Sequence, residues 1–214
     1  MAMQPGTDAP VSYVIARIVL KGLFRILGGI TSLGAENVPL RGPVIICPNH
    51  LSDCDPHAIF ATCARYDVMF LAKDELFEMP VLGAILRALP IIAIKRDSAD
   101  RAAIRKAEAV LNAGGVLVMF PEGRLSESGQ LGRIQPGAAL ISLRTGAPIV
   151  PVGISRTHWF LPYGHYVPRF SRMPARVVYG KPIVPDSGQA HPNRRIIDGT
   201  TADLESRIRG LTGQ

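Results

Sequence analysis

The chain has 214 residues, 47% of them hydrophobic, which is enough to bury one sizeable core and excludes general disorder. Its net charge of +7 is uneven: residues 1–123 carry 12 basic and 12 acidic side chains, so the whole excess lies in residues 124–214. The second half should therefore attract anions such as phosphorylated metabolites or anionic lipid surfaces. The sequence has few aromatic residues and no recognisable nucleic-acid-binding motif, which argues against nucleic acid as the partner.

The first predicted element, in residues 11–30, is an amphipathic helix. Its apolar residues form a broad surface, and Arg17, Lys21 and Arg25 recur at every fourth position along one edge. Because these cations are interleaved with the apolar residues, the segment is not a secretory signal peptide. A spanning helix is also disfavoured, since each charge costs about 2.5–3.5 kcal/mol at the bilayer centre. Two interpretations stay open: an anchor formed by residues 1–34 that lies in the membrane interface, or a helix packed on the protein's own core.

Apolar strands then alternate with helices. Strands are predicted at residues 43–47, 68–71, 91–94, 116–120 and 148–152. The clearest helices run from Ser98 to Gly114 and over residues 135–146. Near-continuous apolar strands separated by helices predict an α/β fold, with a mostly parallel sheet flanked by helices and buried on both faces.

The pattern loosens after this region, with a further strand predicted at residues 175–179. Residues 186–214 form a polar tail that is expected to end in a short helix at 201–211. No internal repeat or low-complexity linker interrupts the chain, so we assign residues 35–185 to a single α/β domain.

Three polar clusters follow predicted strands. His50 comes just after the first strand, Arg96 just after the third, and residues 121–124 just after the fourth. Ligands of parallel sheets gather at the carboxyl ends of the strands, so these clusters should converge on one rim.

The His50 cluster contains the best candidates for chemistry. Asp55 follows His50 in an H-x4-D pattern, and an imidazole beside a carboxylate can take a proton from a hydroxyl near neutral pH. Cys54 is a possible nucleophile, but a small buried residue at a helix start is the favoured interpretation. A metal site built from His50, Asp53, Asp55 and His57 is disfavoured, because the spacing matches no known ligand set.

The number and spacing of the cysteines indicate the redox state of the compartment. Cys47, Cys54 and Cys63 lack C-x-x-C spacing, which argues against a disulfide framework and against a zinc finger. We therefore expect a reducing compartment.

Four blocks occur in order: residues 49–55 with H-x4-D, residues 91–96, residues 120–126 with F-P-E-G, and residues 149–153 with V-P-V. Together they resemble the glycerolipid acyltransferases, and most closely the 1-acyl-glycerol-3-phosphate acyltransferases, over residues 10–185. H-x4-D alone arises often by chance, whereas the ordered set is specific. The fourth block is primarily strand core.

The resemblance implies acyl transfer from a thioester, on acyl-CoA or acyl carrier protein, to a hydroxyl of lysophosphatidic acid or a related lysolipid, which makes phosphatidic acid. It implies that His50 is the general base and that Asp55 orients and supports the imidazolium. Because a thioester is already activated, no cofactor, metal or covalent enzyme intermediate is expected.

The resemblance also implies cations for the acceptor phosphate. Arg96 stands where the family places a phosphate-binding arginine, Lys95 beside it is a candidate helper, and Lys73 matches a familiar lysine after the second strand. The alternative for each is a solvated surface cation. Asn49 and Ser52, in the first block, are also predicted to bind substrate.

The third block both matches and departs from the family pattern. Glu122 is expected to bind a glycerol hydroxyl or to hold the loop, and Gly123 to let backbone approach the ligand. Arg124 follows the glycine directly, whereas the family usually has this arginine one place later, where Leu125 stands here. Arg124 and Ser126 are predicted substrate contacts, and the departure leaves the acceptor head group open.

We therefore predict a peripheral or monotopic membrane protein at the cytoplasmic face of the inner membrane. Two alternatives remain: acylation of another lysophospholipid or of glycerol-3-phosphate, and a lipid-binding protein without turnover.

Overall fold

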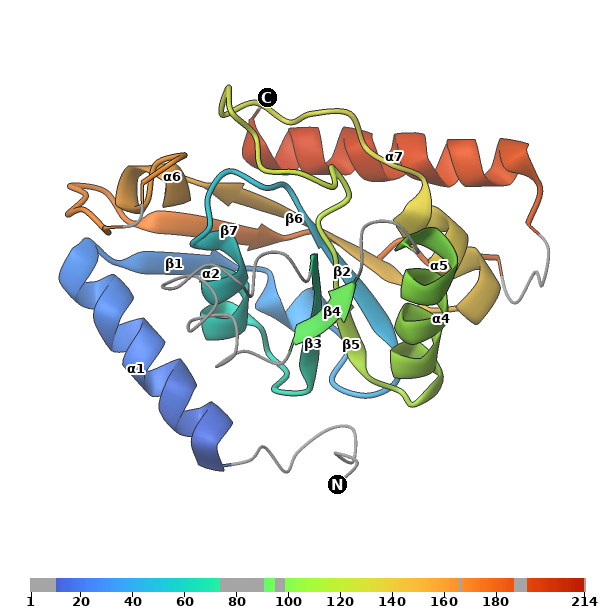
Figure 1. The fold of residues 1–214 in the computed structure, drawn as a ribbon, viewed down its shortest axis with the longest axis horizontal. Helices are drawn as coiled ribbons and strands as arrows, with labels where there is room; N and C mark the ends of the chain where they lie inside the picture. Colours follow the sequence, from blue (N-terminus) through green and yellow to red (C-terminus); the bar gives the residue numbers. More distant parts are fainter. Residues whose placement is uncertain (1–10, 74–90, 95–98, 166, 187–191, 214) are drawn as a thin grey trace.

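A computed structural model describes residues 11–73, 91–94, 99–165, 167–186 and 192–213. In this part of the chain, one sheet has seven strands in the order β1-β7-β6-β2-β5-β3-β4 (Figure 1). Along the chain these are β1 Ile30–Leu33, β2 Val44–Pro48, β3 Val68–Lys73, β4 Ile91–Ile94, β5 Val116–Val118, β6 Ile149–Ser155 and β7 Ala175–Tyr179. Only the β6–β7 pair is antiparallel among these strands, so the mostly parallel sheet predicted from the sequence is confirmed.

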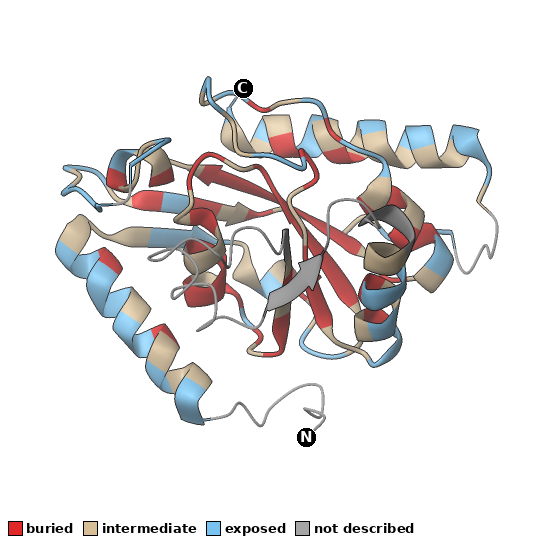
Figure 2. Ribbon diagram, viewed as in Figure 1, coloured by how far each residue is buried: buried red, intermediate tan, exposed pale blue. Residues whose placement is uncertain are grey.

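Helices cover both faces of the sheet. They are α1 Val11–Leu27, α2 Asp55–Thr62, α4 Ala99–Asn112, α5 Gly137–Thr145, α6 Thr157–Phe160 and α7 Arg194–Thr212, with a 3-10 turn at Ala35–Asn37. Alternate residues of β2 enter two separate cores: Val44 and Ile46 pack toward α1 and α2, whereas Ile45 and Cys47 pack toward α4, α5 and α7. Figure 2 shows the buried central strands between these two layers. Burial on both faces explains why the strands are apolar at nearly every position.

β1, α6 and α7 differ from the prediction. No helix was predicted where α6 stands. β1 was not predicted, because it is a short edge strand whose residues are mostly exposed and show no apolar run; it forms by pairing with β7. The terminal helix is longer than predicted, since α7 begins at Arg194. Its start is fixed by Asn193, whose side chain accepts a hydrogen bond from the Ile196 N–H at 3.0 Å.

The N-terminal helix packs on the core through one side only. Tyr13 and Phe24 make edge-to-face contacts with Phe60 and Phe160, each at 6.0 Å between ring centroids. Arg17, predicted at the cationic edge, is instead buried, and its guanidinium lies 3.7 Å from the Tyr66 ring centroid. The packed-helix interpretation is therefore correct for this side of α1.

The other side of α1 is apolar and exposed. The large apolar residues on it are Val11, Ile15, Ile18, Val19, Leu23 and Ile26. None of the helices in the described residues is long and apolar enough to cross a membrane. α1 thus has one side packed on the core and another, apolar side exposed.

Candidate active site

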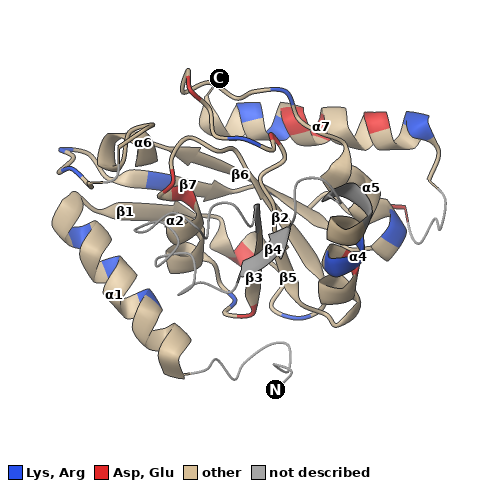
Figure 3. Ribbon diagram, in the orientation of Figure 1, with Lys and Arg blue, Asp and Glu red and all other residues tan. Residues whose placement is uncertain are grey.

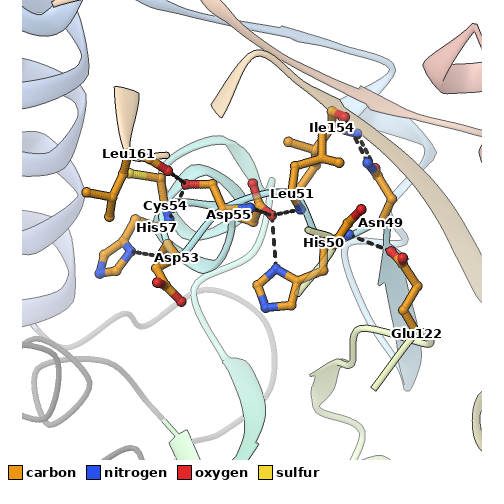
Figure 4. A network of polar contacts seen from close by, with 12 residues as sticks. Asn49, His50, Leu51, Asp53, Cys54, Asp55, His57, Glu122, Ile154 and Leu161 are labelled. Atoms are coloured by element: carbon orange, nitrogen blue, oxygen red, sulfur yellow. Dashed lines mark hydrogen bonds and ion pairs between the residues drawn. The ribbon is translucent and has the colours of Figure 1, made fainter. Parts of the chain in front are cut away.

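The His50 segment lies at the carboxyl end of β2, in the middle of the sheet. The chain leaves β2 at Pro48, turns through residues 49–54 and enters α2 at Asp55. The Asp55 N–H donates to the Ser52 carbonyl at 2.9 Å, which closes the turn. This turn carries His50 back toward the side chain of Asp55 (Figure 4).

The Asp55 carboxylate is fully buried, and one of its oxygens collects three donors. Oδ2 accepts from the Leu51 N–H at 2.6 Å, from the Ser52 N–H at 2.8 Å and from His50 Nδ1 at 3.0 Å. Because an ionised carboxylate can only accept, the His50 proton must sit on Nδ1 and the lone pair on Nε2. The imidazole is thereby set up as a base at Nε2. Oδ1 of Asp55 is buried without a hydrogen-bond partner among the described residues.

The His50 ring is further fixed by an aromatic neighbour. Phe120 stacks on it with ring centroids 4.0 Å apart and an interplanar angle of 24°. The side chain keeps 17% of its surface exposed, so a substrate hydroxyl can reach the ring. The sequence marks Phe120 only as part of a motif, because nothing in a linear pattern predicts a stack between a residue of the turn after β2 and one of the segment after β5.

Glu122 joins the two segments of the site. Its Oε1 accepts from the His50 N–H at 2.8 Å and its Oε2 from the Gly132 N–H at 2.7 Å. The Ser126 N–H donates back to the His50 carbonyl at 2.8 Å. Of the two roles considered for Glu122, these contacts favour holding the loop, since the buried carboxylate is engaged by backbone on both oxygens.

Other residues of the F-P-E-G block lie at the surface beside it. Gly123 has φ of 71°, and no atom within 4 Å would meet a Cβ there, so backbone conformation and not space requires the glycine. Arg124 is exposed, where an anion can reach it. The Ser126 hydroxyl donates to the Gln130 carbonyl at 2.7 Å, within its own loop.

Asn49 and Ser52, predicted substrate contacts, are fully buried and bonded to backbone. The Asn49 amide donates to the Ile154 carbonyl at 3.0 Å and accepts from the Ile154 N–H at 2.6 Å, which ties the end of β2 to β6. The Ser52 hydroxyl donates to the Leu161 carbonyl at 2.7 Å and accepts from the Cys54 N–H at 3.1 Å. These contacts favour structural roles for both side chains.

The remaining polar residues of the segment surround the pair without joining it. Asp53 offers its backbone carbonyl to His57 Nδ1 at 3.2 Å. Burial raises the pKa of Asp53, opposed by the charge of His50 and reinforced by that of Asp55. Burial lowers the pKa of His57, which favours its neutral form. Among the described residues, no group of three His, Cys, Asp or Glu side chains is arranged to hold a metal ion.

Cys54 stands at the N-cap of α2, at the helix start that was predicted, but it is only partly buried. Burial, with the neighbouring Asp55 charge, raises the pKa of its thiol to about 12. The thiolate that a nucleophile requires is therefore scarce at neutral pH.

The predicted phosphate-binding cations are placed only in part. Lys73 is the last residue of β3, at the same edge of the sheet as His50. Lys95 and Arg96 lie outside the described residues, directly after β4. Since β2, β5, β3 and β4 are adjacent and parallel, the carboxyl end of β4, at Ile94, lies at the rim that carries His50.

Fold and site together define an α/β protein with a general-base pair at the rim of a parallel sheet. A family model described as Acyltransferase matches residues 29–155, and the chain belongs to this family. The chain is 30% identical over 153 residues to a 1-acyl-sn-glycerol-3-phosphate acyltransferase from Borreliella burgdorferi, a match that covers 70% of this chain and 61% of that protein. This chain also matches a chloroplastic 1-acyl-sn-glycerol-3-phosphate acyltransferase from Brassica napus, but the match covers only 38% of that protein.

Two other proteins match over nearly the whole chain. A 1-acyl-sn-glycerol-3-phosphate acyltransferase from Bacillus subtilis is 24% identical over 200 residues, covering 93% of this chain and 96% of that one. The crystal structure of the 1-acyl-sn-glycerophosphate (LPA) acyltransferase PlsC from Thermotoga maritima superposes with a TM-score of 0.71 at 25% identity. That match covers 93% of this chain and 78% of the solved one. The resemblance predicted from the four blocks is confirmed.

Proposed function

We propose that this chain transfers a fatty acyl group from a thioester to the free hydroxyl of 1-acyl-glycerol-3-phosphate, which yields phosphatidic acid and a free thiol. The observation that carries the proposal is the His50–Asp55 pair, whose proton arrangement leaves a base at Nε2. The matches to proteins described as 1-acyl-sn-glycerol-3-phosphate acyltransferases support the acceptor.

In the proposed mechanism, His50 Nε2 takes the proton of the acceptor hydroxyl as its oxygen attacks the thioester carbonyl carbon. The buried Asp55 carboxylate stabilises the imidazolium that forms, through the hydrogen bond to Nδ1. The tetrahedral intermediate then expels the thiolate as the C–S bond breaks. The imidazolium returns its proton to the sulfur, which restores His50 for the next turnover.

We assign recognition of the acceptor phosphate to Arg124, Arg96 and Lys95. Arg124 is exposed beside the Glu122 loop, and Arg96 with Lys95 follows β4. An arginine fork suits phosphate because it donates two parallel hydrogen bonds. We expect Arg96→Ala and Arg124→Ala to raise the apparent KM for the phosphorylated acceptor more than they lower kcat.

The experiment that tests the function is thiol release from acyl-CoA and from acyl carrier protein with a panel of acceptors: lysophosphatidic acid, other lysophospholipids and glycerol-3-phosphate. We expect turnover with lysophosphatidic acid that His50→Ala abolishes without a change in thermal melting. Preference for another lysolipid would instead fit the shifted position of Arg124. Release with none of the acceptors would support a lipid-binding protein without turnover.

The proposed acceptor is a membrane lipid, so we further propose that the protein works as a peripheral or monotopic protein at the cytoplasmic face of the inner membrane. Support comes from α1, whose outer side exposes apolar residues beside Lys21 and Arg25. Ile15→Ser with Ile18→Ser makes this side less apolar and should lower the fraction of protein that co-sediments with vesicles.

A further inference from the structure

A second exposed apolar segment lies far from α1 in sequence. Between the start of α6 and β7, large apolar side chains are exposed at Trp159, Tyr163, Val167, Phe170 and Met173. Val167 and Phe170 are 75% and 78% exposed, as much as any large apolar residue on α1. A concentration of exposed apolar side chains indicates a contact surface, because soluble monomers rarely expose large contiguous apolar patches to water.

The two segments are neighbours in space. The Ser171 N–H donates to the Leu27 carbonyl at the end of α1 at 2.8 Å, and Phe160 contacts Phe24 of α1. Figure 1 shows the end of α1 and the orange connection after α6 at the same left edge of the molecule. The carboxyl end of α1 and the described residues of 159–173 therefore adjoin, and both expose large apolar side chains. We name them together the docking surface.

Basic side chains accompany the apolar ones. Arg156, Arg169, Arg172 and Arg176 lie in or next to the segment, whereas residues 128–185 contain no Asp or Glu at all. Lys21 and Arg25 flank the exposed side of α1, and Figure 3 shows basic residues of both segments at this edge. A protein partner requires a matching acidic and apolar surface, but an anionic bilayer supplies both features at once, with lipid phosphates above an apolar interior.

We propose that residues 159–165 and 167–173 form a second membrane-binding element beside α1, which inserts its aromatic side chains into the interface of an anionic bilayer while the arginines bind lipid phosphates. Tyr and Trp are suited to this depth, because one part of each ring system is apolar and another can hydrogen-bond to water. The binding itself does not depend on the proposed function, but its benefit, which is to bring a lipid acceptor to the site, rests on that function.

The segment also contacts the turn that carries His50 and the loop that contains Glu122. Its Leu161 carbonyl accepts a hydrogen bond from the Ser52 hydroxyl of the His50 turn. The Tyr163 hydroxyl donates to Glu127 Oε1 at 3.3 Å, in the loop that Glu122 holds against His50. The proposed element is thus joined by hydrogen bonds to both segments that build the site.

Trp159 offers a direct test, since it is the chain's only tryptophan and is 44% exposed in the proposed element. The intact protein is mixed with vesicles of phosphatidylcholine, with and without phosphatidylglycerol, and with brominated phosphatidylcholine. We expect a blue shift of Trp159 emission and quenching by the brominated lipid, both stronger with phosphatidylglycerol. Co-sedimentation without any shift or quenching would overturn the proposal, because the protein would then bind through another surface.

Variants separate the apolar and the ionic contributions. Val167→Ala with Phe170→Ala should weaken vesicle binding by about tenfold or more. The matched control, Leu40→Ala with Val184→Ala, removes apolar side chains that are 66% and 76% exposed outside the docking surface, and it should leave binding unchanged. Equal binding by the test variant and the wild type would refute the second element.

For the charges, Arg169→Gln with Arg172→Gln should weaken binding to vesicles containing phosphatidylglycerol by about fivefold per arginine, and binding to phosphatidylcholine alone much less. Arg194→Gln with Arg195→Gln, exposed on α7, is the control. A wild-type dimer in light scattering that Phe170→Ala converts to monomer would overturn the bilayer in favour of a second copy. Turnover on soluble short-chain substrates is measured in parallel, so loss of the proposed function is recognised separately from loss of binding.

Discussion

The Asp55 carboxylate allows its catalytic and structural roles to be separated by two substitutions. Asp55→Asn keeps an oxygen that can accept the Leu51 and Ser52 N–H groups but removes the negative charge opposite His50 Nδ1. Asp55→Ala removes the acceptor as well. Each buried N–H left without a partner costs about 1–3 kcal/mol, so two of them cost about 2–6 kcal/mol. A typical domain has only about 5–15 kcal/mol of stability.

We therefore expect Asp55→Ala to melt at a much lower temperature and Asp55→Asn to melt close to the wild type. Loss of the charge that stabilises the imidazolium should lower kcat of Asp55→Asn on the order of 10²- to 10⁴-fold. This corresponds to about 3–5 kcal/mol of transition-state stabilisation. Thiol release at saturating acceptor and thermal melting measure the two effects.

Asp53→Asn is the matched control, because this carboxylate lies two residues away and has no hydrogen bond to the His50 ring. It should retain kcat within a fewfold of the wild type. The reasoning is refuted if a folded Asp55→Asn keeps more than about a tenth of wild-type kcat, or if Asp53→Asn is the more damaging change.

Four further predictions concern the surroundings of the pair. Asn49→Ala leaves the N–H and carbonyl of Ile154 unpaired in the core, so it should lower stability by about 2–4 kcal/mol in denaturant unfolding; an unchanged midpoint contradicts the structural role. Glu122→Gln can still accept from the His50 N–H but introduces a donor where two acceptors are needed, so kcat should fall with little change in acceptor KM; a selective rise in KM would show substrate contact instead. Cys54→Ala should retain turnover, and iodoacetamide at neutral pH should not inactivate the enzyme, since the thiol pKa is about 12; rapid inactivation through Cys54 would oppose this. Burial lowers the pKa of His57 below 6.5 in the folded state, so the unfolded chain takes up the proton first and stability falls as pH drops below about 6.5; His57→Asn should flatten the pH dependence of melting, and an unchanged slope would assign it to other groups.

Much of the fold was predictable because the central strands are buried on both faces. The runs at β2, β3 and β6 are apolar at almost every position, and no surface segment would carry them. β1 escaped prediction because it is an exposed edge strand, and its hydrogen bonds to β7 depend on a partner far along the chain. Arg17 likewise matched a cationic edge in sequence, whereas the Tyr66 ring and the Arg65 carbonyl draw it into the core.

The sequence by itself determined which residues can do the chemistry. H-x4-D places a base and a carboxylate within one turn, and the order of blocks marks the family, since local spacing is fixed by the covalent chain. Tertiary structure decided what each neighbour does. Buried polar groups must find partners, and only the fold supplies them: Glu122 holds His50 in place, Asn49 joins β2 to β6, and Ser52 reaches the Leu161 carbonyl. The same packing brings residues 159–173 beside α1, a neighbourhood that no linear pattern encodes.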